Sequence, residues 1–153
     1  ISAYGSFDKT VSENFKRIRV LKDHNPTLMI GVPLEIDTKD TYGLLTKTQF
    51  NMKKDLGRDM FTDVQRMFEN GLSAELSIGH KAVKRDIKNK SIIQEYFLGE
   101  YSFLSNWASN KLATVQDIKS IKSHYGILEL IEKSYNLILS KLIIKSLFKL
   151  LIK

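Results

Sequence analysis

Residues 71–80 read GLSAELSIGH, which places two serines, a glutamate and a histidine inside ten positions. From residue 74 to residue 84 polar and apolar side chains alternate, a pattern typical of a β-strand. On such a strand Glu75, Ser77 and Gly79 share one face, and the intervening leucine and isoleucine share the other. A glycine at this point lets backbone or substrate approach closely. The pattern alone favours a solvent-facing serine on a two-faced strand, and the alternative is a nucleophile.

The segments around this stretch read as strands and helices joined by polar turns. Alternation and β-branched residues predict strands over residues 17–21, 28–36, 41–50, 74–84 and 91–104. Apolar spacing of three and four predicts helices over residues 6–15 and 56–71. Pro33 lies inside a predicted strand, which implies an edge position or a β-bulge because proline cannot donate to the ladder. The sequence therefore predicts an α+β fold that is mainly β.

From about Asp117 onward apolar residues recur at helical spacing, and lysines recur every fourth residue near the end. We expect a protein domain over residues 1–117 and a long amphipathic helical segment over residues 118–153. Most of the net charge of +7 belongs to this tail, because residues 119–153 hold seven lysines against two glutamates. The helix is expected to pack on the domain, to mediate self-association, or to bind a scaffold or membrane surface.

Composition excludes several kinds of chemistry. The chain of 153 residues has no cysteine, so a disulfide scaffold, a thiolate zinc site and a cysteine nucleophile are ruled out. There is no glycine-rich phosphate loop and no cluster with zinc-ligand spacing, so we expect no cofactor and no metal. No uncharged apolar stretch reaches 18 residues, so no transmembrane helix is expected. The chain begins with Ile1 rather than methionine, and we expect its natural N-terminus to be missing.

A serine nucleophile needs a base, and the chain has three histidines. His24 lies in LKDHNP, where a predicted strand enters a turn, a placement that suits an imidazole projecting into a cleft. A surface turn histidine is the alternative. His80 follows the Ser-Ile-Gly segment but points to the face opposite Gly79, and His124 belongs to the tail.

An imidazole base is usually oriented by a carboxylate. Glu95 and Glu100 both lie in the strand predicted over residues 91–104. Five residues separate them, so in a regular strand they face opposite sides. Structural glutamates show the same pattern, and the residues alone leave the choice open.

Several stretches taken in order resemble the tailed-phage prohead (procapsid) maturation proteases. They are GSFDKT, RIRVLKDHNPTLMIGVPLEI, TYGLLTKTQF, MFENGLSAELSIGH and EYSFLSNWASNKLATV, and the resemblance that contains them covers residues 5–117. The resemblance rests on their order and spacing rather than on any single motif. It implies a fold related to herpesvirus assemblin, a β-barrel flanked by helices.

The same resemblance implies a serine endopeptidase. Matched position by position, Ser77 corresponds to the nucleophile, His24 to the general base and Glu100 to the acidic third member. The enzyme would work inside the procapsid, in the bacterial host cytoplasm. It would cleave the phage scaffold protein, or the scaffolding segment of the major capsid protein, and then itself.

The resemblance also implies a homo-oligomer, without nucleic-acid or membrane partners and without a cofactor or metal. A second function stays open beside the protease. A non-enzymatic capsid-assembly or scaffold protein that keeps the protease fold has the same sequence pattern.

Overall fold

The computed structural model describes residues 1–41 and 43–119. By internal contacts the chain divides into two units, Ile1–Gln116 and Asp117–Lys153. The long C-terminal amphipathic helix that we expect over residues 118–153 lies almost entirely outside the described residues.

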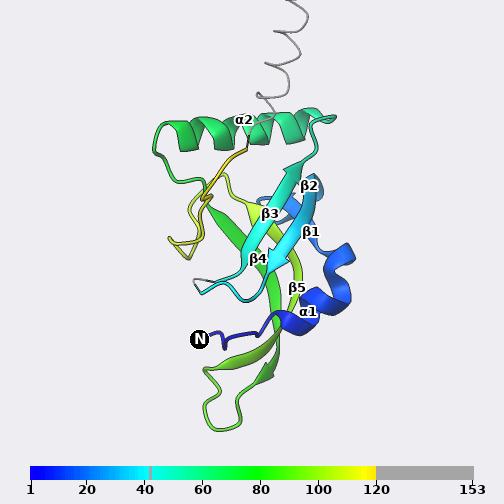
Figure 1. Ribbon diagram of the computed structural model, residues 1–153, viewed down its shortest axis with the longest axis vertical. Helices are drawn as coiled ribbons and strands as arrows, with labels where there is room; N and C mark the ends of the chain where they lie inside the picture. The colour runs from blue at the N-terminus through cyan, green and yellow to red at the C-terminus, as the bar shows by residue number, and fades with distance from the viewer. Residues whose placement is uncertain (42, 120–153) are drawn as a thin grey trace, which may run out of the picture. The chain divides into compact units, whose positions relative to one another are not determined.

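The first unit is mainly β with two α-helices (Figure 1). Its elements are, in order, α1 (Asp8–Asn14), the 3-10 turn η1 (Phe15–Arg17), β1 (Arg19–Lys22), β2 (Asn25–Asp37), β3 (Leu45–Phe50), α2 (Asp55–Glu69), β4 (Leu76–Arg85) and β5 (Ile93–Phe103). The α+β class predicted from the sequence is therefore confirmed. No helix among the described residues is long and apolar enough to cross a membrane.

The strands form one mixed sheet in the order β3-β2-β1-β5-β4. Neighbours pair antiparallel except β1 and β5, which run parallel. The assemblin-like barrel implied by the resemblance is wrong for the residues described. A barrel requires its two edge strands to pair, whereas β3 and β4 remain the edges of an open sheet.

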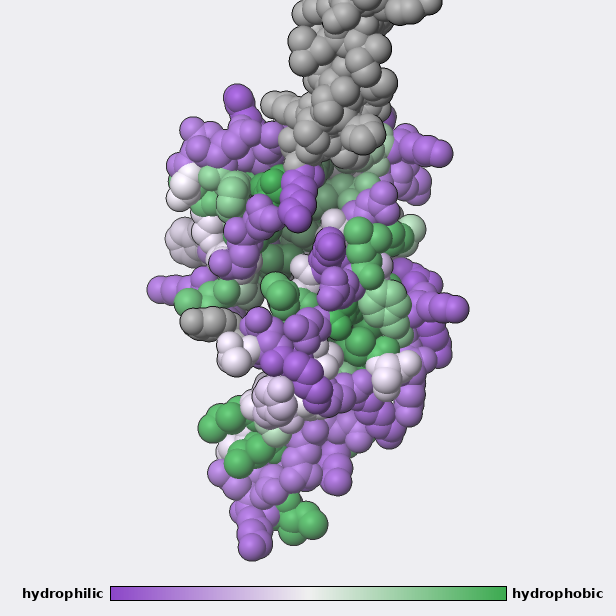
Figure 2. Space-filling view, viewed as in Figure 1, coloured by the Kyte–Doolittle hydropathy of each residue, from purple (hydrophilic) through white to green (hydrophobic). Residues whose placement is uncertain are grey.

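The core lies between α2 and the sheet. Phe50 of β3 contacts the ring of Phe61 from α2 at 5.5 Å and that of Phe103 from β5 at 4.9 Å, measured between ring centroids. Met60 and Val64 are buried on the same side of α2. Figure 2 shows the corresponding division on the surface, since hydrophilic side chains cover the outer side of α2 and hydrophobic ones gather beneath it. The apolar side of α2 thus determines which face of the sheet the helix covers.

The N-terminal segment supports β5 from the side. Phe7, just before α1, stacks on Tyr96 of β5 with centroids 4.7 Å apart. Within α1 the buried Thr10 hydroxyl accepts a hydrogen bond from the Leu98 N–H at 3.1 Å. These contacts hold the middle of β5, and the end of β5 is left to carry polar side chains.

Candidate functional site

The turn between β1 and β2 carries His24 in an unusual backbone conformation. Lys22 and Asn25 pair across the hairpin, so Asp23 and His24 are its two loop residues. Both have positive φ, 53° and 57°, as the central residues of a type I′ turn require. Asparagine and glycine usually fill these places, because a left-handed residue with a Cβ costs about 1–2 kcal/mol. A conformation of this kind persists only where neighbouring structure holds it.

The end of β5 provides that support. The Asp23 N–H donates to the Phe103 carbonyl at 3.1 Å, and the His24 N–H donates to the Ser102 hydroxyl at 3.0 Å. The Asp23 carboxylate accepts from the N–H and the hydroxyl of Ser105, both at 2.6 Å. Burial raises the pKa of Asp23, but the hydrogen bonds from Ser105 outweigh it, so the pKa lies below its ordinary value. Both loop residues of the turn are therefore held by hydrogen bonds to the end of β5 and to Ser105.

The imidazole of His24 is paired with Glu100. Its Nδ1 lies 2.7 Å from Glu100 Oε1, and the side chains of the two residues are 43% and 15% exposed. Because an ionised carboxylate can only accept, Nδ1 is the donor in this contact, and in a neutral imidazole the lone pair is then on Nε2. Nε2 forms no hydrogen bond with any described residue. In its neutral form His24 thus presents Nε2 as the unbonded nitrogen that a general base needs.

Ser102 forms hydrogen bonds with both members of this pair. Its hydroxyl donates to Glu100 Oε2 at 2.6 Å while it accepts the His24 N–H, and the residue is fully buried. One hydroxyl therefore fixes both the carboxylate and the backbone that carries the imidazole. Second partners of this kind usually decide how well an acid–base pair is oriented.

The pairing of β4 with β5 brings Ser77 to the same place. Ser77 lies opposite Ser102, and Gly79 lies opposite Glu100. Residues opposite each other on neighbouring strands project to the same face of the sheet. Ser77 is half-buried, and its hydroxyl forms no hydrogen bond to a described residue. The three sequence-predicted residues, Ser77, His24 and Glu100, thus gather at the β1–β2 turn and the adjoining parts of β4 and β5.

Gly79 makes room for the Glu100 carboxylate. A Cβ at this position would lie 2.7 Å from Glu100 Cδ and would overlap Oε1. The sequence predicts close approach of backbone or substrate at Gly79. What the structure brings there is the carboxylate of the neighbouring strand. A glycine in β4 is therefore a condition for the His24–Glu100 pair.

Replacing Gly79 by alanine is expected to displace Glu100 and to destabilise the unit by about 1–3 kcal/mol, the usual cost of overpacking. Urea unfolding monitored by circular dichroism measures the loss. Gly71→Ala is no suitable control, because Gly71 has φ 69° and alanine would be strained there for a different reason. Ala82→Gly in the same strand is the better comparison, since it also changes a single methyl group, but at a position that is not opposite Glu100. An unchanged stability of Gly79→Ala would contradict the close packing described.

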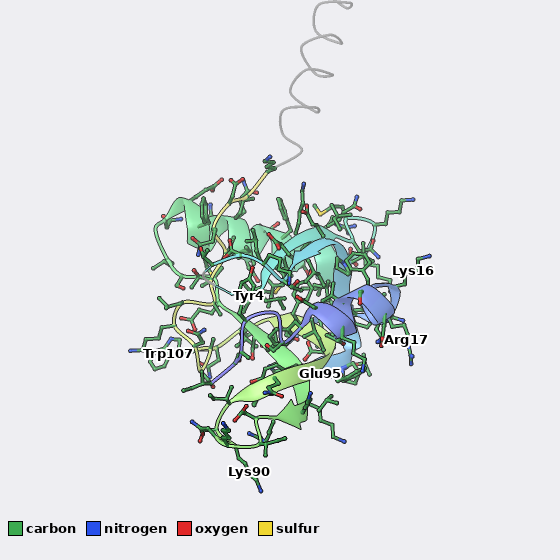
Figure 3. The ribbon with its side chains drawn as sticks, turned by 60° about the horizontal axis from the view of Figure 1, so that its bottom comes forward. Tyr4, Lys16, Arg17, Lys90, Glu95 and Trp107 are labelled. Carbon is green, nitrogen blue, oxygen red and sulfur yellow. The ribbon has the colours of Figure 1, made fainter. Side chains whose placement is uncertain are left out.

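Other candidates lie elsewhere. His80 donates from Nδ1 to the Ile78 carbonyl at 3.2 Å and places its ring edge-on to Tyr96 at 4.9 Å. Glu95 forms an ion pair with Lys9 at 3.1 Å on the part of β5 beside α1 (Figure 3). His124 lies outside the described residues.

The loop after β5 is also hydrogen-bonded to the residue just before β4, the strand that carries Ser77. The Glu75 carboxylate accepts the Ala108 N–H, which ties the loop to the start of β4. The neighbouring Trp107 is 89% exposed and projects from the loop (Figure 3). Glu75 shares the face of Ser77 in the sequence pattern, but its bond is to the loop backbone.

Sequence reasoning missed Ser102 and the role of Asp23. The signal for Ser102 was present in the spacing Glu-x-Ser, since residues two apart on a strand share a face. For Asp23 the sequence predicts only a turn position, because its partner Ser105 lies 82 residues away.

The arrangement can transfer a proton but offers no evident metal site. Among residues 1–41 and 43–119 no group of three or more histidine, aspartate and glutamate side chains could hold a metal ion. Ser77 lies on the same sheet face as the His24–Glu100 pair, without a hydrogen bond to it, and these three residue types are the ones that nucleophilic acyl transfer uses. Comparison of the chain with protein-family models, curated proteins and solved structures finds no match.

Proposed function

We propose that this chain is a serine endopeptidase of the tailed-phage prohead maturation type. The observation that carries the proposal is the 2.7 Å contact between His24 Nδ1 and Glu100 Oε1, made on the sheet face that also carries Ser77. In this proposal Ser77 is the nucleophile, His24 the base and Glu100 the orienting acid.

The chemistry follows from the orientation of the imidazole. His24 Nε2 takes the proton of Ser77 as its oxygen attacks the peptide carbonyl, and Glu100 stabilises the resulting imidazolium. Collapse of the tetrahedral intermediate breaks the peptide bond, and His24 returns the proton to the departing amine. Water then releases the acyl group from Ser77 by the same exchange in reverse. No step needs a cofactor or a metal.

The biological setting rests on the resemblance in residues 5–117. We propose that the substrates are the phage scaffold protein or the scaffolding segment of the major capsid protein, and the chain itself. The site would then work inside the procapsid, in the host cytoplasm, as part of a homo-oligomer without nucleic-acid or membrane partners. The site needs only β1, β2, β4 and β5, so the proposal does not depend on closure of the sheet into a barrel.

A fluorophosphonate probe tests the proposal directly, because it reacts with an activated serine whatever peptide the enzyme prefers. We expect the folded protein to be labelled at Ser77, as located by mass spectrometry of its peptides. Exposed serines such as Ser12 and Ser91 should remain unlabelled, and heat-unfolded protein should not react.

His24→Asn is expected to remove the labelling while the turn is kept, because asparagine tolerates positive φ. A folded parent protein that is not labelled would favour the other function, an assembly or scaffold protein without peptidase activity.

A further inference from the structure

The edge of β4 offers a hydrogen-bond donor beside Ser77, and this inference rests on the proposed protease function. Attack on a carbonyl develops a negative charge on its oxygen, which serine hydrolases stabilise with N–H donors. The question is which backbone N–H near Ser77 is turned toward the place where a substrate can lie.

Two hydrogen bonds fix the direction of the backbone groups in β4. The Leu104 N–H donates to the Glu75 carbonyl at 3.0 Å, so Glu75 faces β5. The Leu76 N–H donates to the Ala113 carbonyl at 2.7 Å, so Leu76 faces away from β5. In an antiparallel strand the N–H and C=O of one residue point to the same side, and successive residues alternate.

The alternating direction of the backbone N–H groups continues through Ser77. The register with β5 is unbroken from Leu76 to Gly79 and shifts only after Gly79. Ser77 and Gly79 therefore turn their N–H groups into the sheet, and Ile78 turns its N–H outward. The bond from the His80 ring to the Ile78 carbonyl at 3.2 Å agrees, because that carbonyl must also face outward.

The outer side of β4 is covered only before Ser77. Residues 113–115 run along it, with Val115 N–H bonded to the Ala74 carbonyl and Thr114 bridged to Glu75. That pairing ends at Leu76, and no described strand lies beyond β4 from Ser77 onward. The Ile78 N–H, next to Ser77 in the chain, is therefore not paired with any described strand.

We propose that the Ile78 N–H is an oxyanion donor of the Ser77 site. The N–H of Ser77 itself cannot serve, because it is turned toward β5. As the bond from Ser77 Oγ to the carbonyl carbon forms, the π-electron pair moves to the oxygen and the serine proton moves to His24 Nε2. Ile78 donates to that oxygen until the pair returns and the C–N bond breaks, with the proton passing to the amine.

The test replaces the backbone N–H of residue 78 by an ester oxygen, using the α-hydroxy acid analogue of isoleucine. The side chain stays the same and only the donor is lost. The readout is the rate constant of Ser77 modification by a fluorophosphonate, in which the Oγ–P bond forms, fluoride leaves and His24 takes the proton. We expect the rate to fall about 10²–10³-fold, as for removal of one oxyanion donor.

An ester at Leu76 is the matched control. Its N–H also faces outward, but it donates to Ala113 rather than to a substrate. This variant should lose thermal stability and keep its labelling rate within a few-fold of the parent, so a general effect of backbone esters is separated from loss of the donor. An Ile78 ester that is labelled as fast as the parent would overturn the assignment, whereas an unlabelled parent would overturn the protease function itself.

Discussion

Replacing Ser77 by alanine is expected to reduce fluorophosphonate labelling by at least about 10³-fold and to leave folding stability within about 0.5 kcal/mol of the parent. The labelling is lost because the attacking oxygen is removed. The stability is kept because the Ser77 hydroxyl is half-buried and has no hydrogen bond to a described residue. Labelling rate and urea unfolding are measured on the same preparation.

Ser102, which lies opposite Ser77 on β5, provides the matched control. Ser102→Ala removes the same atom, but that hydroxyl accepts from His24 N–H and donates to Glu100 Oε2. Because the partners are left unsatisfied in a buried place, we expect a loss of about 1–3 kcal/mol of stability. The variant retains its nucleophile, so labelling at Ser77 is weakened rather than abolished.

The two variants therefore separate a reacting serine from a supporting one. If Ser102→Ala abolished labelling without loss of stability while Ser77→Ala was labelled normally, the roles assigned here would be reversed. If both variants were labelled as the parent, neither residue would be the nucleophile.

The elements of the fold could be predicted from local pattern because each has a clear period. The helix expected over residues 56–71 is α2, and the strand expected over 74–84 is β4, within two residues at either end. Pro33 was expected at an edge or a bulge, and β2 has a register shift between Pro33 and Glu35. Because β2 lies inside the sheet, the missing N–H of Pro33 is accommodated by this bulge rather than by an edge position.

The arrangement of the sheet could not be predicted in the same way. The parallel pairing of Arg19–Lys22 with residues 100–103 joins segments about 80 residues apart, and nothing in either segment signals the other. The resemblance suggested a closed barrel, but closure depends on edge-to-edge pairing rather than on the period of any one strand.

The candidate site shows the same division between local and distant information. A turn at DHNP was predictable, but positive φ at Asp23 and His24 was not, because their support comes from Ser102 and Ser105. Glu95 and Glu100 were indistinguishable as sequence. The structure separates them, since Glu95 is paired with Lys9 and Glu100 with His24.

Replacing Glu100 by glutamine is expected to lower the rate of Ser77 labelling by about 10³–10⁴-fold, as for the loss of the carboxylate in a serine–histidine–aspartate triad. The amide keeps the shape of the side chain but can present an NH2 group to His24 Nδ1. The imidazole then places its proton on Nε2, where it can no longer accept the proton of Ser77. The rate constant of fluorophosphonate labelling and the imidazole 15N shifts of His24 together measure the effect.

Glu95→Gln is the control for this change, because it makes the same substitution in the same strand but affects only a partly exposed ion pair with Lys9. Such pairs contribute about 0–1 kcal/mol, so this variant should be labelled at the parent rate and should unfold close to the parent midpoint. A Glu100→Gln protein that reacted as fast as the Glu95→Gln protein would show that the carboxylate has no part in orienting His24. The 2.7 Å contact would then be a structural ion pair that stabilises the β1–β2 turn, and the case for a protease would rest on Ser77 and His24 alone.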